Sequence, residues 1–319
     1  MGRILVTRHL PAGGLDPLRG HQLVQRQQDV PYNRQDLLAA VSDVDAIVCL
    51  LTDQIDAEVI AAAPRLRAIG NVAVGYDNVD VAAAARAGVA VCNTPGVLDE
   101  TTADVAFGLI IAASRLFGEA ERDLRAGRWR GWAITQYLGR DVHGASLGVV
   151  GYGRIGRAVA RRAAGFGMRV THHARRDTGE PGYLASLDEL LAEADVVSLH
   201  VPLSQATRHL IGRRELALMK PTAVLVNTSR GPVVDEEALA EALGSGEIFA
   251  AGLDVFEEEP RVHPRLLAAP RAVLLPHVGS GSQQTRTRMA RLAADGVRAV
   301  LAGERPLNLV SPSASRAAP

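Results

Sequence analysis

The sequence predicts an α/β protein built from doubly wound parallel sheets. Short apolar runs alternate with helical patterns along nearly the whole chain, which is typical of strands buried on both faces of a parallel sheet. The chain of 319 residues is also too long for one ordinary core and suits two domains. The expected strands are Ile4–Thr7, Ala46–Leu50, Ala68–Val72, Val89–Cys92, Ser146–Val150, Arg169–His172, Val196–His200, Ala223–Asn227, Ala250–Leu253 and Val273–Leu275.

Two long helices interrupt this alternation and divide the chain. Residues 101–115 are apolar on nearly every face, which is typical of a buried helix. A second long helix, from about Ser282 to Leu301, would return the chain to its first domain. We therefore predict a discontinuous domain of residues 1–95 and 278–310, with a second domain of residues 96–277 inserted in it. Residues 311–319 have the composition of a disordered tail.

Charge and cysteine content exclude several function classes. Lys and Arg number 35 and so do Asp and Glu, so no net field draws the chain to nucleic acid or to a membrane surface. Cys49 and Cys92 lie in apolar runs typical of buried, reduced thiols, and their number excludes a disulfide framework or a metal site. Without a signal peptide pattern or an apolar stretch of bilayer length, the protein is expected in the cytoplasm.

The clearest motif is a glycine-rich turn between a strand and a helix. Gly151, Gly153 and Gly156 follow the predicted strand Ser146–Val150 in the pattern G-x-G-x-x-G. The first glycine permits a tight turn, the second lets a pyrophosphate approach the backbone, and the third lets the helix pack on the strand. The helix N-terminus then offers free N–H groups to the phosphates. Because a helix and another strand follow, the motif predicts a dinucleotide site.

The end of the next strand bears on which dinucleotide binds. An acidic residue there would accept hydrogen bonds from the ribose 2′-OH of NAD. The sequence instead has Ala174, followed by Arg175 and Arg176. Guanidinium groups suit a 2′-phosphate, so the pattern favours NADP(H) over NAD. The alternative is that both arginines are solvated and that Asp177 takes the place of the acidic residue.

Three later strand ends carry ionisable residues, namely Arg230, Glu259 and His277. The carboxyl ends of parallel strands are where open α/β sheets bind ligands. Reduction of a keto acid needs a cation for its carboxylate and carbonyl, and an acid for the developing alkoxide. Arg230 can bind the anion, His277 can donate the proton, and Glu259 would orient the imidazole ring. The neighbouring Glu257 and Glu258 are expected on a solvated face.

Six stretches of the chain resemble the D-isomer-specific 2-hydroxyacid dehydrogenases in order and spacing, over almost the whole length. Within that family the chain is most similar to the glyoxylate/hydroxypyruvate reductases, through Cys49–Asp53, Gly127–Trp132 and His277–Ser280. The six stretches are Asn71–Asp80, Asn93–Asp104, Gly151–Gly156, Val226–Gly231, Gly252–Pro260 and Pro276–Ser280.

The resemblance implies a Rossmann-like cofactor domain inserted into a discontinuous, flavodoxin-like substrate domain. It implies a homodimer joined through the cofactor domains. It also implies hydride transfer from NAD(P)H to a small 2-keto acid, giving the D-isomer where C2 is stereogenic. Arg230 would bind the substrate, and Glu259 with His277 would form the acid pair.

The resemblance further implies contacts for both ligands. The backbone at Val74 and Gly75 would hold the substrate carboxylate, and Leu51 and Trp132 would border the substrate pocket. The implied cofactor contacts, besides the three glycines and two arginines, are Arg154 and Ile155 through their N–H groups, and Thr102, Thr228, Asp254 and Gly279 on the nicotinamide side.

Two other functions stay open on the sequence alone. An NAD-linked dehydrogenase of another small anion, such as D-lactate, phosphite or 3-phosphoglycerate, would share most of these motifs. A nucleotide-sensing scaffold of the same fold would bind the cofactor with negligible turnover. Measured turnover separates the scaffold from either enzyme.

Overall fold

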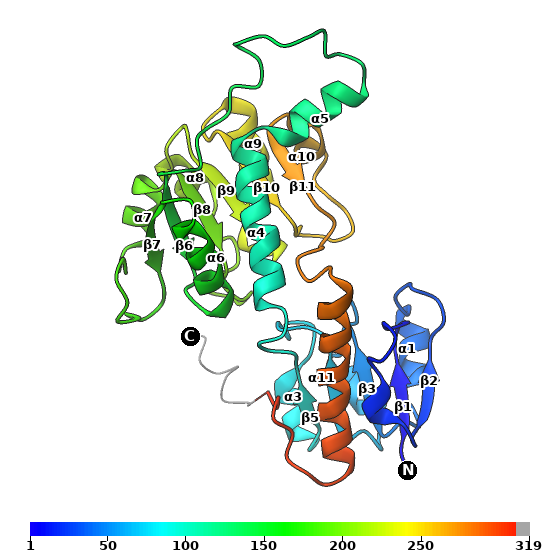
Figure 1. Ribbon diagram of the computed structural model, residues 1–319. Coiled ribbons are helices and arrows are strands. Elements are labelled where there is room, and N and C mark those ends of the chain that lie inside the picture. The colour runs from blue at the N-terminus through cyan, green and yellow to red at the C-terminus, as the bar shows by residue number, and fades with distance from the viewer. Residues whose placement is uncertain (311–319) are drawn as a thin grey trace. The chain divides into compact units, whose positions relative to one another are not determined.

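The structure is a computed structural model that describes residues 1–310, and it divides into two compact units. Unit 1 joins Met1–Leu98 to the residues from Ser280 onward, and unit 2 is Asp99–Gly279. Each unit is a parallel sheet with helices packed along it, as the sequence predicts (Figure 1). The expected tail, residues 311–319, lies outside the described residues.

The sheet of unit 1 has the strand order β2-β1-β3-β4-β5, and all neighbouring strands are parallel. The chain goes from β1 to β2 on one side and then crosses to β3 on the other, so the sheet is doubly wound. Open sheets of this kind commonly bind ligands at the carboxyl ends of the two strands where the winding reverses, here β1 and β3. The elements are β1 (Arg3–Val6), η1 (Asp16–Leu18), β2 (Gln22–Gln25), α1 (Arg34–Ala40), β3 (Ala46–Cys49), α2 (Ala57–Ala61), β4 (Ala68–Asn71), α3 (Val81–Arg86), β5 (Ala90–Cys92) and α11 (Gln283–Leu301).

Strand β2 is missing from the predicted strands, for a physical reason. It is an edge strand that pairs only with β1 among the described residues. Its sequence is Gln-Leu-Val-Gln, and its first two residues are exposed. A continuous apolar run marks strands that are covered on both faces, so this strand gives no such signal.

Helix α11 packs on β3, β4 and β5 and completes unit 1 (Figure 1). Ser282 caps its N-terminus, because the Ser282 hydroxyl accepts a hydrogen bond from the N–H of Thr285 at 3.2 Å. The sequence predicts that this helix begins at about Ser282, one residue before its first residue in the structure. Its buried face is made largely of small residues, which allows a close approach to the sheet.

The sheet of unit 2 has the order β11-β10-β9-β8-β6-β7, again parallel throughout. Its winding reverses between β6 and β8. The elements are α4 (Asp99–Ser114), α5 (Phe117–Arg125), β6 (Ser146–Val150), α6 (Arg154–Ala164), β7 (Arg169–His173), α7 (Leu187–Glu193), β8 (Val196–Leu199), α8 (Arg213–Leu218), β9 (Val224–Asn227), η2 (Gly231–Val233), α9 (Glu236–Ser245), β10 (Ala250–Leu253), α10 (Pro264–Ala268) and β11 (Ala272–Leu274).

Helix α4 is the apolar helix that the sequence predicts, and it packs on β9, β10 and α6 within unit 2 (Figure 1). Half of its residues are buried, among them Phe107, Leu109 and Ile110. Among residues 1–310, no single helix has both the length and the apolar character to cross a membrane. Helices α4 and α5 meet that criterion only as a pair, and they are bent by 69° at their junction.

Candidate active site

Three adjacent strands of unit 2 bring the predicted acid–base residues to one edge of the sheet. Arg230 follows β9, Glu259 lies in the loop after β10, and His277 lies in the loop after β11. These strands are neighbours and parallel, so their carboxyl ends point the same way. The order β11-β10-β9 therefore places the loop that carries Glu259 between the other two.

Glu259 and His277 form a direct pair. Nδ1 of His277 lies 2.8 Å from Oε2 of Glu259, and the two side chains are 25% and 28% exposed. The second carboxylate oxygen, Oε1, accepts a hydrogen bond from the N–H of Phe256 at 3.0 Å. Both carboxylate oxygens are thus engaged, and the bond to Nδ1 leaves Nε2 as the ring nitrogen available to a ligand.

The backbone around His277 is held by a buried carboxylate. Oδ1 and Oδ2 of Asp254, which is 1% exposed, accept hydrogen bonds at 2.7 Å from the N–H groups of Val278 and Gly279. His277 itself has a φ of 53°, a left-handed conformation that is uncommon outside glycine. Burial raises the pKa of Asp254 and outweighs the two N–H donors and the His277 charge. Asp254 therefore fixes the turn that presents the imidazole.

Arg230 reaches the same edge because a glycine follows it. A Cβ on Gly231 would lie 1.8 Å from the carbonyl carbon of Phe256, so only glycine lets the loop after β9 lie against the loop after β10. The buried Asn227 side chain shapes the loop: it donates to the carbonyl of Arg230 at 2.9 Å and accepts from the N–H of Ser229 at 3.0 Å.

The charges of the three residues are coupled. Burial alone raises the pKa of Glu259, but the hydrogen bond and charge of His277, the N–H of Phe256 and the charge of Arg230 outweigh it. The pKa of Glu259 is consequently lowered. The carboxylate stays ionised at neutral pH and can stabilise a positive charge on the imidazole.

The glycine-rich turn has the geometry that its motif predicts. Gly151 has a φ of 93°, and a Cβ on it would lie 2.7 Å from the carbonyl group of His200. A Cβ on Gly156 would lie 2.3 Å from the Gly151 carbonyl oxygen, so the helix packs directly on the turn. Around Gly153, by contrast, no described atom lies within 4 Å of such a Cβ. Two glycines serve internal packing, and the third faces open space.

Helix α6 begins at Arg154 and Ile155, with Gly153 as its N-cap and without a side chain that caps it. The N–H groups of the first turn of an α-helix have no partner within the helix, so this terminus suits an anion. The sequence predicts this helix from Arg157, three residues late, because the motif glycines obscure its start.

The end of β7 carries no acidic side chain at the expected position. Ala174 follows the last strand residue, and Arg175 and Arg176 come next with exposed side chains. Asp177, the alternative acid, turns back to its own loop, where Oδ1 accepts a hydrogen bond from the N–H of Gly179 at 2.9 Å.

The residues predicted on the nicotinamide side lie partly together. A Cβ on Gly279 would be 3.0 Å from Oδ2 of Asp254 and 3.4 Å from Cγ2 of Thr102, so these three residues are neighbours. Thr228 follows β9, and its buried Oγ1 has no hydrogen-bond partner among the described residues. A buried hydroxyl of this kind commonly forms a hydrogen bond to a ligand or a water.

The predicted carboxylate loop belongs to unit 1, after β4. The carbonyl of Val74 accepts from Asn93 Nδ2 at 2.7 Å, and that of Gly75 accepts from Asn71 Nδ2 at 2.9 Å. Within residues 1–310, the N–H groups of Val74 and Gly75 find no acceptor in the protein. Leu51 lies in the turn after β3 of the same unit and is half-buried.

Trp132 is far from buried, with 80% of its surface exposed. It lies in the segment after α5. Other large apolar residues of α5 and of the segment after it are also exposed: Phe117, Leu124, Trp129, Ile134 and Leu138.

The chain matches a known family over most of unit 2 and matches whole relatives over its full length. The family model described as D-isomer specific 2-hydroxyacid dehydrogenase, NAD binding domain, matches residues 107–279. A glyoxylate reductase of Korarchaeum cryptofilum is 50% identical over 318 residues, which cover 97% of this chain and 96% of the relative. The chain belongs to the D-isomer specific 2-hydroxyacid dehydrogenase family.

Solved structures agree with this dehydrogenase assignment. The crystal structure of the TT0316 protein from Thermus thermophilus superposes with a TM-score of 0.91 at 46% identity, covering 97% of this chain and all of that chain. An NADPH-dependent glyoxylate/hydroxypyruvate reductase from Sinorhizobium meliloti, solved with NADP and malonate, has a TM-score of 0.86 at 37% identity. That match covers 97% of this chain and 96% of the other.

One expectation for this dehydrogenase is wrong. Glu257 is not on a solvated face: its side chain is 19% exposed, and Oε1 accepts a hydrogen bond from the N–H of Glu236 at 2.9 Å. Its other oxygen lies 3.1 Å from Nε2 of His209. Glu258 is exposed as expected and pairs with Arg261. Adjacent residues in a turn can face opposite ways, which charge pattern alone cannot show.

Sequence reasoning also missed a group of buried polar residues in unit 1 of the dehydrogenase. Arg8, Asp53, Asn71 and Asn78 are each between 0% and 6% exposed. Each ends a buried strand or lies in the loop after one, at the carboxyl edge of the sheet. A charged or amide residue directly after a buried strand could have predicted a buried polar interaction there, since buried polar groups need hydrogen-bond partners.

Proposed function

We propose that the protein reduces glyoxylate or hydroxypyruvate to the 2-hydroxy acid, with the D-configuration where C2 is stereogenic, at the expense of NADPH. The single observation that carries the proposal is the Glu259–His277 pair at 2.8 Å beside the charge of Arg230. A keto acid needs this combination of an acid and a cation, whereas oxidation of formate needs no proton donor. The names of the relatives support the same substrate class.

The residues around the glycine-rich turn fit a nicotinamide dinucleotide. The uncapped start of α6 and the open space at Gly153 would hold the pyrophosphate through the N–H groups of Arg154 and Ile155. The unpartnered Thr228 hydroxyl, with Thr102, Asp254 and Gly279, would face the nicotinamide. We accordingly assign dinucleotide binding to unit 2 and substrate binding to unit 1, with bounds at residues 98 and 279.

In this proposal the protein's own residues donate the proton and bind the substrate, and the cofactor supplies the hydride. When bound, the reduced cofactor supplies the hydride for C2 of the keto acid. His277 donates a proton from Nε2 to the carbonyl oxygen, while Glu259 stabilises the positive imidazole and fixes its plane. Arg230 offers a guanidinium charge to the carbonyl and carboxylate oxygens of the substrate.

Substrate binding also involves unit 1 in this proposal. The N–H groups of Val74 and Gly75, which lack acceptors in the described protein, would bind the substrate carboxylate. Leu51 would limit the size of the acyl substituent. Trp132 would border the pocket from a neighbouring subunit, because its side chain is exposed in the single chain.

The preference for NADPH rests on the loop after β7. Ala174 cannot accept a bond from a ribose hydroxyl, and Asp177 is engaged with Gly179. Arg175 and Arg176 are exposed next to that position and would hold a 2′-phosphate. The NADP complex of the Sinorhizobium meliloti reductase supports the same cofactor.

We also propose a homodimer joined through unit 2. Six exposed large apolar side chains lie within residues 117–138, and such residues commonly mark a protein–protein contact when they form one patch. A second copy of the same segment is the partner that the family implies, and a two-fold axis would bury the segment against itself.

The test follows the absorbance of the reduced nicotinamide with purified protein. NADPH and NADH are each combined with glyoxylate or hydroxypyruvate, and the oxidised cofactors with D-lactate, phosphite or 3-phosphoglycerate. We expect rapid NADPH oxidation with glyoxylate or hydroxypyruvate, and slower oxidation of NADH. If neither acid supports oxidation of either cofactor, the proposal is wrong. Turnover with one of the other anions would then identify the substrate class.

A further inference from the structure

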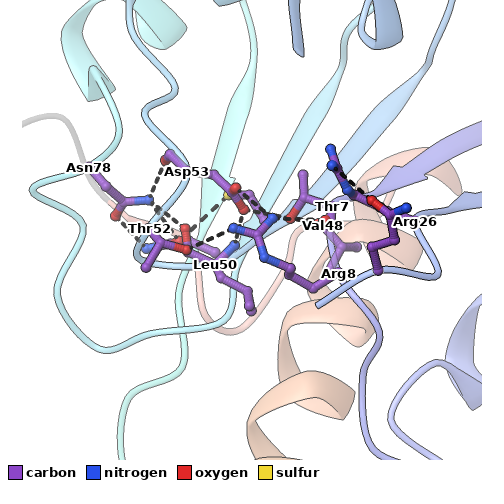
Figure 2. A network of polar contacts seen from close by, with 11 residues as sticks. Thr7, Arg8, Arg26, Val48, Leu50, Thr52, Asp53 and Asn78 are labelled. Carbon is purple, nitrogen blue, oxygen red and sulfur yellow. Dashed lines mark hydrogen bonds and ion pairs between the residues drawn. The ribbon is translucent and has the colours of Figure 1, made fainter. Parts of the chain in front are cut away.

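A buried polar network ties together the loops at the carboxyl edge of the unit 1 sheet (Figure 2). It contains an ion pair, Arg8 with Asp53, and an amide pair, Asn71 with Asn78. Arg8 and Asp53 are each 3% exposed, and Nη1 of Arg8 lies 3.0 Å from Oδ1 of Asp53. We call these four residues the edge network.

The ion pair occupies the switch point of the sheet. Arg8 follows β1 and Asp53 follows β3, the two strands between which the winding reverses. Sheets of this kind commonly bind a ligand at that point. Here two buried side chains, Arg8 and Asp53, pair with each other at that point.

The ion pair holds both ends of the turn after β3. Asp53 Oδ2 accepts from the N–H of Leu50 at 2.9 Å and from the Thr7 hydroxyl at 2.5 Å. Arg8 Nη2 donates to Oγ1 of Thr52 at 3.0 Å, and Figure 2 shows the guanidinium lying between Thr52 and Thr7. The turn that carries Leu51 is therefore fixed to Thr7 and Arg8, the residues after β1, by three bonds: Thr7 to Asp53, Arg8 to Asp53 and Arg8 to Thr52.

The amide pair extends this hold to the next loop. Nδ2 of Asn78 donates to the carbonyls of Leu50 and Asp53, both at 3.0 Å. The amide groups of Asn71 and Asn78 also face each other, with N–O distances of 3.1 and 3.2 Å. Nδ2 of Asn71 donates to the carbonyl of Gly75 at 2.9 Å. These side-chain bonds link the turn after β3 to the loop after β4, in addition to the backbone hydrogen bonds that join Ile55 to Asn78 and Asp80.

Stability by itself does not explain such a construction. A buried ion pair loses the solvation of both charges, and apolar residues of similar volume often stabilise a fold as well or better. The bonds of the ion pair end on the residues after β1 and on the turn after β3, which carries Leu51. The amide pair adds bonds to the loop after β4, which carries Val74 and Gly75. Together the two pairs specify the geometry of the loops that hold the unit 1 residues of the proposed substrate site.

We infer that the edge network positions the substrate-binding loops of unit 1, with Arg8 and Asn78 as positioning residues that do not touch the substrate. This inference rests on the proposed function. The carbonyls of Val74 and Gly75 are bound to Asn93 and Asn71, which turns the loop so that its N–H groups stay free for a carboxylate.

The test compares kinetic constants across matched variants of the full chain. Arg8→Lys keeps the charge but loses the fork that reaches Thr52 and Asp53 together. Arg8→Met with Asp53→Leu replaces the pair by apolar residues and guards against a fold that fails through a lone buried charge. The control is Arg65→Lys, because Arg65 pairs with Asp45 at 2.8 Å at the other end of β3.

We expect both Arg8 variants to raise KM for glyoxylate by roughly ten- to hundredfold, as misplaced binding groups do. NADPH affinity, measured by fluorescence, and kcat at saturating glyoxylate should stay within about threefold of the wild type, since unit 2 is unaltered. A purely structural role predicts a lower thermal midpoint without this split between KM and kcat, as we expect for Arg65→Lys. Unchanged KM in both Arg8 variants would overturn the inference.

Hydrogen exchange separates this inference from the proposed function. A wild-type protein that oxidises no NADPH with glyoxylate counts against the function alone. The amides of residues 50–53 and 72–79 should still exchange faster in Arg8→Lys than in Arg65→Lys, because their anchor is weakened. Equal exchange in these two segments would overturn the positioning role whatever the substrate.

Discussion

His277 and Glu259 face each other across two loops of unit 2, with 2.8 Å between Nδ1 and Oε2. The carboxylate is pinned a second time by the N–H of Phe256, so the pair has little freedom to turn. The turn that carries His277 is in turn held by Asp254. Changing either member of this pair should therefore have a distinct effect on the kinetics.

Glu259→Gln should lower kcat by about ten- to hundredfold and move the alkaline limb of the rate profile to lower pH. Glutamine fills the same space but has no charge to stabilise a protonated imidazole. The measurement is kcat/KM for glyoxylate between pH 5 and pH 9. A parallel loss at all pH values, without a shifted limb, would contradict the electrostatic role of Glu259.

Arg175→Ala combined with Arg176→Ala should raise KM for NADPH at least about tenfold and leave KM for NADH nearly unchanged. Only NADPH carries the 2′-phosphate that the guanidinium groups would bind. Arg161→Ala is the matched control, because Arg161 is exposed in the same unit and pairs with Glu100. Equal effects on both cofactors in the double variant would remove the 2′-phosphate assignment.

His200 should make unit 2 less stable in acid. Burial lowers the pKa of His200 from 6.5 to about 4, so the unfolded chain takes up a proton at a higher pH than the folded chain does. The stabilisation is complete above about pH 6.5 and is lost as the pH falls towards 4, amounting to about 2–3 kcal/mol.

The corresponding measurement is the free energy of unfolding from pH 7 to pH 4. His200→Gln retains a hydrogen-bonding group for Ser198, whose hydroxyl lies 2.9 Å from Nε2, and should flatten the curve. His143→Gln, at an exposed histidine of the same unit, should leave it unchanged. Parallel curves for the wild type and His200→Gln would show that His200 does not supply this pH dependence.

Trp132→Ser combined with Ile134→Ser should convert the proposed dimer to a monomer and raise KM for the keto acid. These side chains are 80% and 74% exposed in the single chain, and a polar replacement removes the gain from covering them. Light scattering gives the mass. Leu267→Ser, at a 64% exposed residue of α10, is the control that should stay dimeric. A double variant that stays dimeric would place the interface elsewhere.

The sequence predicts most strands of this fold because they are covered on both faces and read as continuous apolar runs. Strand β2 lacks that property and is absent from the prediction. The sequence also predicts that Arg230, Glu259 and His277 follow strands of one sheet, because charged residues after buried strands are conspicuous. The partner of Glu257 could not be predicted from the sequence, because its bond to Glu236 depends on how two separate turns meet in space.

The edge network shows a different limit. Arg8 and Asp53 are 45 positions apart in the sequence. They pair because β1 and β3 are neighbouring strands of the sheet. Polar residues after strands predict that an interaction exists at the sheet edge. Which of these residues pair with each other depends on the strand order.

The most direct measurement is a single turnover of NADPH with glyoxylate in His277→Gln, followed by stopped-flow absorbance. We predict that loss of the proton donor slows cofactor oxidation by roughly 10²–10⁴-fold, while NADPH affinity stays unchanged. His209→Gln, which alters the second His–Glu pair of unit 2, should react at the wild-type rate. A rate for His277→Gln within a few fold of the wild type would contradict the assignment of His277 as the acid.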